Sequence, residues 1–130
     1  MFSTIWGDSL AFTAKTRHEG PISIIDVAGR LTSFEVGGLR DAIRLLLQQG
    51  RKDIVLNLRD LEYLDSSGIG ELAREYVVVV KQGGQMKVVG LTAKVEEVLK
   101  ITHLYQVFQD FPSEEDALRS FPNPSGKKTS

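Results

Sequence analysis

Residues 53–81 are DIVLNLRDLEYLDSSGIGELAREYVVVVK, and they carry the clearest structural pattern in the chain. The residues at 53–58 are mostly apolar, which is typical of a short strand buried on both faces. The charged residues at 59–64 predict a loop, which leads to Asp65-Ser66-Ser67-Gly68. A strand and a loop therefore deliver two hydroxyl groups and a glycine to the start of the next element.

The element from Ser66 to Lys81 is predicted to be a helix. Its valines at 77–80 would favour a strand on their own. Serine is a preferred residue at helix starts, however, and the glycines at 83–84 end the segment. Apolar residues also recur at helical spacing, and we expect these to face the core: Ile69, Leu72, Ala73, Tyr76 and Val80.

Strands and helices are predicted to alternate along the rest of the chain. The predicted elements are strands at 10–16 and 22–28, a helix at 32–49 opened by a Thr32–Glu35 capping box, a strand at 85–89, a helix at 92–101, a short strand or turn at 107–111 and a helix at 113–121. A turn at 19–21 makes the first two strands an antiparallel hairpin. The later alternation predicts an α/β fold. It has a mostly parallel sheet of four or five strands, an antiparallel N-terminal strand and about four flanking helices.

The 130 residues suit one domain. We expect residues 1–10 to form an N-terminal arm and residues 11–121 to form the domain. Residues 122–130 are small, polar and proline-bearing, so a disordered tail is predicted there.

The composition excludes several classes of protein. Sixteen Lys and Arg against seventeen Asp and Glu give a net charge of −1, so no general attraction to nucleic acid or to an anionic membrane is expected. No run approaches the roughly 20 apolar residues of a membrane span. The chain has no cysteine, which excludes disulfides and thiolate catalysis. The first ten residues do not resemble a secretory signal, so the expected location is the cytoplasm.

The start of the helix at Ser66 is suited to negative charge. Helix N-termini have free N–H groups and the positive end of the helix dipole, and a phosphate fits that geometry. Phosphorylation of a serine there would add about −1.5 to −2 charges at neutral pH. The simpler interpretation is that Ser66 and Ser67 only cap the helix.

The segment LNLRDLEYLDSSGIG at 56–70 resembles the signature of the STAS family, specifically the bacterial anti-sigma factor antagonists. Further similarity covers about residues 10–121 and is carried by the segments at 29–32, 83–89, 98–108 and 113–118. The resemblance implies a STAS-type fold and a regulatory function in transcription.

The resemblance also implies a phosphorylation switch. In that family the unphosphorylated antagonist binds an anti-sigma factor, which is also a GHKL-type serine kinase, and this releases the sigma factor. The kinase phosphorylates the serine after the motif aspartate, which is Ser66 here, and a PP2C-type phosphatase resets the switch. Many relatives have Asp where this chain has Thr32. Thr32 can cap a helix but lacks the charge, which leaves partner choice and phosphorylation efficiency open at that position.

We expect one docking surface for the anti-sigma factor around the phosphorylated serine. The start of the helix and the turn at 32–34 form its centre. On the helix, four residues point away from the predicted apolar stripe. The expected partner-binding residues are Asp65, Ser66, Ser67, Gly68, Thr32, Ser33, Glu71, Arg74, Glu75 and Val78.

An enzyme is not expected, because no G-x-S-x-G elbow and no glycine-rich phosphate loop is present. His18 and His103 are predicted to have structural or surface roles, so neither a metal nor a cofactor is expected. Two alternatives stay open. One is a STAS interaction or sensor module that is not phosphorylated and serves a larger signalling assembly; the other is weak nucleotide binding near Ser66.

Overall fold

The computed structural model describes residues 12–33 and 36–122. Their core is a five-stranded sheet in the order β1-β2-β3-β4-β5. Strand β1 is antiparallel to β2, and the other neighbouring strands are parallel. The elements are β1 (Thr13–Glu19), β2 (Ile22–Leu31), α2 (Val36–Gln48), β3 (Asp53–Leu64), α3 (Ser66–Lys81), β4 (Gln85–Val89), α4 (Ala93–Ile101), β5 (Gln109–Phe111) and α5 (Glu114–Ser120). The predicted fold class is confirmed.

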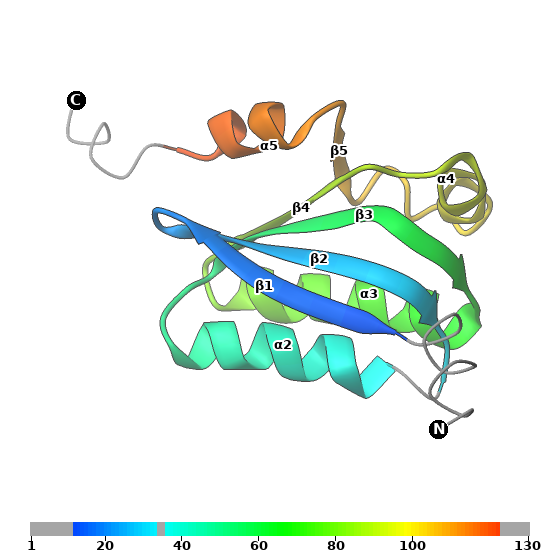
Figure 1. Cartoon of the computed structure of the whole chain (residues 1–130), viewed down its shortest axis with the longest axis horizontal. Coiled ribbons are helices and arrows are strands. Elements are labelled where there is room, and N and C mark those ends of the chain that lie inside the picture. Colours follow the sequence, from blue (N-terminus) through cyan, green and yellow to red (C-terminus); the bar gives the residue numbers. More distant parts are fainter. Residues whose placement is uncertain (1–11, 34–35, 123–130) are drawn as a thin grey trace, which may run out of the picture.

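Helices cover both faces of the sheet. Helices α2 and α3 lie side by side under one face, and α5 lies over the other (Figure 1). Successive side chains of a strand point to opposite faces. On β2, Ile25 therefore joins the main core against α2 and α3, whereas Ile24 joins a smaller cluster under α5 with Ala117 and Phe121.

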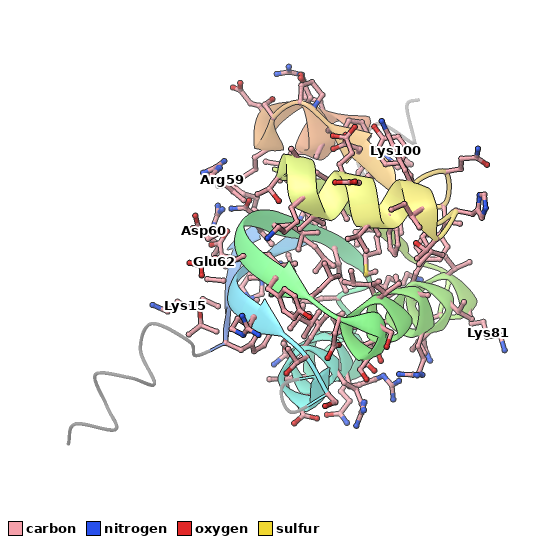
Figure 2. All side chains as sticks on the ribbon, turned by 90° about the vertical axis from the view of Figure 1, so that its right-hand side faces the viewer. Lys15, Arg59, Asp60, Glu62, Lys81 and Lys100 are labelled. Atoms are coloured by element: carbon pink, nitrogen blue, oxygen red, sulfur yellow. The ribbon has the colours of Figure 1, made fainter. Side chains whose placement is uncertain are left out.

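Strand β3 is longer than predicted. The expected loop at 59–64 is wrong, because β3 continues to Leu64 and pairs with β2 as far as Leu31. Leu61 and Leu64 are buried in the core, while Arg59, Asp60, Glu62 and Tyr63 are exposed. Figure 2 shows Arg59, Asp60 and Glu62 pointing out of the molecule on the same side as Lys15 of β1. Because the exposed residues of this part of β3 are mostly charged, its composition resembles that of a loop.

Several predicted boundaries also change. The first strand is Thr13–Glu19 and so continues past the predicted end at 16, while residues 10–11 of the predicted strand lie outside the described residues. In α3 the buried valine is Val79, and Val80, which was expected to face the core, is 46% exposed. The caps predicted at Thr92 and Ser113 are confirmed, since their side chains accept hydrogen bonds from Val95 N and Asp116 N.

Parts of other predictions also lie outside the described residues. These parts are the N-terminal arm at 1–10, the tail from 123 onward, and Phe34 and Glu35, which include one half of the capping box. In the part of the chain that the structure describes, no helix is both long enough and apolar enough to span a membrane.

Candidate functional site

The site is the corner where β3 ends and α3 begins. Asp65 has an extended backbone, and its carboxylate Oδ1 accepts a hydrogen bond from the Gly68 backbone N–H at 3.0 Å. Asp65 is therefore the N-cap, and the prediction that Ser66 and Ser67 cap the helix is wrong. Because strand β3 reaches Leu64, Asp65 is the last non-helical residue and takes the capping position. The two serines become the first helical residues, and both are exposed.

The end of β2 holds this corner in place. The Leu31 carbonyl oxygen accepts a hydrogen bond from the Asp65 N–H at 3.3 Å. A Cβ atom on Gly68 would lie only 2.3 Å from the same oxygen. Helix α3 therefore approaches β2 so closely at this point that only glycine fits, and Gly68 is buried. Gly68 allows this close approach. Because it is buried, it is not accessible to a partner, and the expectation that it belongs to the docking surface is wrong.

Two residues of the predicted docking surface follow Leu31 directly. Thr32 is half-buried and Ser33 is exposed. Because Leu31 contacts both Asp65 and Gly68, the tertiary structure brings Thr32 and Ser33 to the corner that carries Ser66 and Ser67. The polar residues expected at the centre of the surface are thus assembled from two chain segments.

An aromatic–cation pair beside this corner is absent from the sequence predictions. The Arg30 guanidinium lies 4.4 Å from the centre of the Tyr63 ring, and Tyr63 is 37% exposed. The two residues are opposite each other in the β2–β3 register and immediately precede Leu31 and Leu64. Only that register brings them together, so no local sequence pattern could have identified the pair.

Two residues predicted to face a partner are buried instead. Glu71 and Glu75 are both 0% exposed, because α2 packs on that side of α3. Arg40 and Arg74 form ion pairs with Glu71, and Arg44 donates two hydrogen bonds to Glu75 at 3.0 and 3.1 Å. Helical periodicity marks these glutamates as lying off the apolar stripe, but it does not reveal that a second helix covers them.

The other two helical residues of the predicted surface remain accessible. Arg74 is exposed, and its guanidinium is held by Glu71. Val78 is half-buried in a hollow between α2 and α3, which it lines with Arg44, Leu47, Gln48 and Gln82. The accessible part of the helical face is therefore smaller than predicted.

Burial also changes the ionisation of Glu75. The pKa of this carboxyl group rises from 4.5 to about 7, first because burial disfavours its charge and second because the Glu71 carboxyl group lies beside it. Arg44 opposes the rise without cancelling it. The Glu71 Oε2 atom is buried and accepts no hydrogen bond, although Arg40 Nε lies 3.5 Å away.

We predict that Glu75→Gln flattens the pH dependence of stability. Between about pH 4.5 and 7 the folded chain keeps a proton on Glu75 that the unfolded chain has lost. The free energy of unfolding should therefore fall as pH rises through this window, by up to about 3 kcal/mol at 1.36 kcal/mol per pKa unit. Glutamine cannot lose a proton, so the variant should be the more stable protein at pH 8.

Urea denaturation at several pH values above 5 measures this effect. In that range Asp26 and Glu114 contribute little to the slope, because Arg17 lowers the pKa of both groups. Glu97→Gln, on the exposed side of α4, is the matched control and should keep the wild-type profile. Parallel profiles for wild type and Glu75→Gln would contradict the assignment.

The described residues contain no group of three or more His, Asp or Glu side chains placed to hold a metal ion. His18 is exposed on β1 and lies 3.0 Å from the Ser23 hydroxyl, and His103 is exposed in the turn after α4. Among the chemical groups that the corner presents to solvent are the hydroxyl groups of Ser66 and Ser67, at the start of α3.

Comparison with known proteins agrees with this description. A model of the STAS domain matches residues 13–117. An anti-sigma-B factor antagonist of Bacillus subtilis (strain 168) is 30% identical over 83 residues, which are 64% of this chain and 75% of the relative.

Two solved structures show that the fold is shared. An anti-sigma factor antagonist from Mycobacterium paratuberculosis has a TM-score of 0.75 at 24% identity, covering 85% of this chain and 93% of the other. The Bacillus cell fate determinant SpoIIAA in its phosphorylated form has a TM-score of 0.64 at 23% identity, covering 84% and 97%. The predicted STAS-type fold is therefore confirmed.

Proposed function

Since this chain belongs to the STAS domain family, we propose that it is an anti-sigma factor antagonist switched by phosphorylation of Ser66. The unphosphorylated chain binds an anti-sigma factor, which releases the sigma factor. The anti-sigma factor is also a GHKL-type serine kinase, and it ends the interaction by phosphorylating Ser66. A PP2C-type phosphatase restores the binding form. These events take place in the cytoplasm, and the chain is a regulator with no catalytic activity of its own.

The observation that carries this proposal is the placement of Ser66. It is the first residue of α3, it is exposed, and Asp65 performs the capping that would otherwise occupy a serine hydroxyl. A phosphate at this position lies at the positive end of the helix dipole, so the modified chain stays folded. The shared fold with phosphorylated SpoIIAA is in keeping with that expectation.

The covalent step is a phosphoryl transfer from ATP. The Ser66 Oγ atom attacks the γ-phosphorus, the bond between the γ-phosphorus and the bridging oxygen to the β-phosphate breaks, and ADP leaves. The hydroxyl proton passes to a base of the kinase. This chain supplies only the acceptor hydroxyl and its fixed position.

The proposed docking surface consists of the accessible residues at the corner and of two accessible residues further along α3. It contains Thr32, Ser33, Asp65, Ser66, Ser67, Arg74 and Val78. Phosphate on Ser66 places about two negative charges at the corner of this surface, beside Asp65 and Ser67. The added charge changes what the surface can bind without requiring the domain to unfold.

We predict that incubation with the cognate anti-sigma factor kinase and ATP adds one phosphoryl group to the wild-type chain. Intact-mass measurement should show the same addition for Ser67→Ala and none for Ser66→Ala. Ser67 is the matched control, since it is adjacent and also exposed. Phosphate on Ser67 with Ser66 unmodified would show that the acceptor is wrong. A chain that binds the kinase but accepts no phosphate would instead be an unphosphorylated STAS interaction module.

A further inference from the structure

A groove of about 420 Å³ runs along the open edge of the sheet, between β1 and α2. Alternate residues of β1 line one side of it, and one face of α2 lines the other. The lining residues are Ala14, Thr16, His18, Asp41, Ala42, Leu45, Leu46 and Gln49. Leu45 is 54% exposed there, which is high for a leucine in the middle of an amphipathic helix.

The strand beside this groove has an unused edge. β1 is the first strand in the order of the described sheet, so only β2 pairs with its backbone. Unpaired N–H and C=O groups at a sheet edge are a template for a further strand. The groove thus offers apolar contact from α2 together with backbone hydrogen-bonding groups from β1.

The chain itself enters the groove at one end. Phe12, the first described residue, is half-buried, and its ring atoms lie 3.1 and 3.3 Å from the position that a Cβ on Gly38 of α2 would take. Phe12 therefore belongs to the same side of β1 as Ala14 and Thr16. The residues that precede Phe12 are attached directly to the end of the groove.

Residues 1–11 have the length and composition of an occupant. Ala14 to His18 span about 13 Å of strand, whereas eleven extended residues reach about 36 Å. The segment is MFSTIWGDSLA, in which six residues that include Phe2, Ile5 and Trp6 precede Gly7-Asp8-Ser9. Gly, Asp and Ser are turn-forming residues, so the chain can reverse before Phe12.

We propose that residues 1–6 fold back and dock in the groove between β1 and α2, as an added strand on the edge of β1. A connection of five residues at 7–11 is a common hairpin length. It places Trp6 opposite Phe12, at the Gly38 end of the groove, and Phe2 opposite Thr16, nearer to Leu45, so both aromatic side chains face α2. Docking removes an apolar surface and an open strand edge from solvent at once.

Trp6 tests this proposal directly, because it is the only tryptophan in the chain. In the full-length protein we expect its emission to be shifted to shorter wavelength than in urea and to be protected from quenching by acrylamide. Leu45→Lys removes the apolar contact from α2 at an exposed position and leaves the core unchanged. We expect this variant to lower the docking equilibrium constant about tenfold, which equals about 1.4 kcal/mol.

Val77→Lys is the matched control, since Val77 is 48% exposed on the outer side of α3. It should leave the Trp6 emission and quenching unchanged, and circular dichroism should show that both variants are folded. Wild-type Trp6 that is already as exposed as in urea would overturn the proposal, as would equal protection in Leu45→Lys. Protection that disappears on dilution would also overturn it, because the occupant would then be a second copy.

Discussion

Gly68→Ala is expected to lower the free energy of unfolding by about 3 kcal/mol, a cost typical of overpacking combined with loss of a helix cap. The added Cβ would lie 2.3 Å from the Leu31 carbonyl oxygen. That oxygen cannot move freely, because it also accepts the hydrogen bond from Asp65 N. Either the start of α3 shifts away from β2, or the Asp65 cap on Gly68 is lost.

Gly70→Ala, two residues further along the same helix, is the matched control. The nearest atom to a Cβ at Gly70 is Arg74 Nη2 at 3.9 Å, which is ordinary contact. Alanine is the better helix former, so this variant should be more stable than wild type by up to about 1 kcal/mol. Urea denaturation of both variants measures the difference, and equal effects of the two substitutions would contradict the close approach described for Gly68.

Ser66→Asp is expected to weaken binding to the cognate anti-sigma factor by tenfold or more, and phosphorylation by a hundredfold or more. A negative charge at Ser66 and a carboxylate of the anti-sigma factor about 4 Å away would repel each other by about 1 kcal/mol in water, and by about 4 kcal/mol at an effective dielectric constant of 20. Each 1.4 kcal/mol is a factor of about ten in affinity. The doubly charged phosphate should therefore have a larger effect than the single charge of aspartate.

Isothermal titration against the anti-sigma factor measures these affinities. The proteins compared are wild type, Ser66→Ala, Ser66→Asp and the phosphorylated chain. Ser66→Ala should bind about as well as the unmodified wild type, since only charge and bulk are proposed to break the contact. Ser120→Asp adds the same charge to an exposed position on α5, away from the corner, and should bind like wild type. Equal affinities for wild type, Ser66→Asp and the phosphorylated chain would remove the proposed switch.

Local sequence patterns were sufficient for most of the fold. The apolar run at 53–58, the glycines at 83–84 and the Ser113 cap act through neighbours in the chain, and each is confirmed by the structure. The run at 59–64 was misassigned because its charged residues face solvent from a strand whose other residues are buried. Composition alone does not distinguish a half-exposed strand from a loop.

The candidate site depends more on contacts between distant segments. Ser66 and Asp65 could be selected from a local motif, but Asp65 rather than serine caps the helix because β3 extends to Leu64. Glu71 and Glu75 are of a residue type that usually indicates solvent, but α2 packs over them and three arginines from α2 and α3 pair with them.

The order of strands and helices, and the serine at the start of α3, follow from periodicity and capping, which act over a few residues. The tertiary structure decided which residues share the corner with that serine and which lie under a neighbouring helix. The close contact of Gly68 with Leu31, the pairing of Arg30 with Tyr63 and the burial of Glu75 all join segments far apart in the chain. The physical reason is that burial and sheet register depend on packing between elements, which no short window of sequence contains.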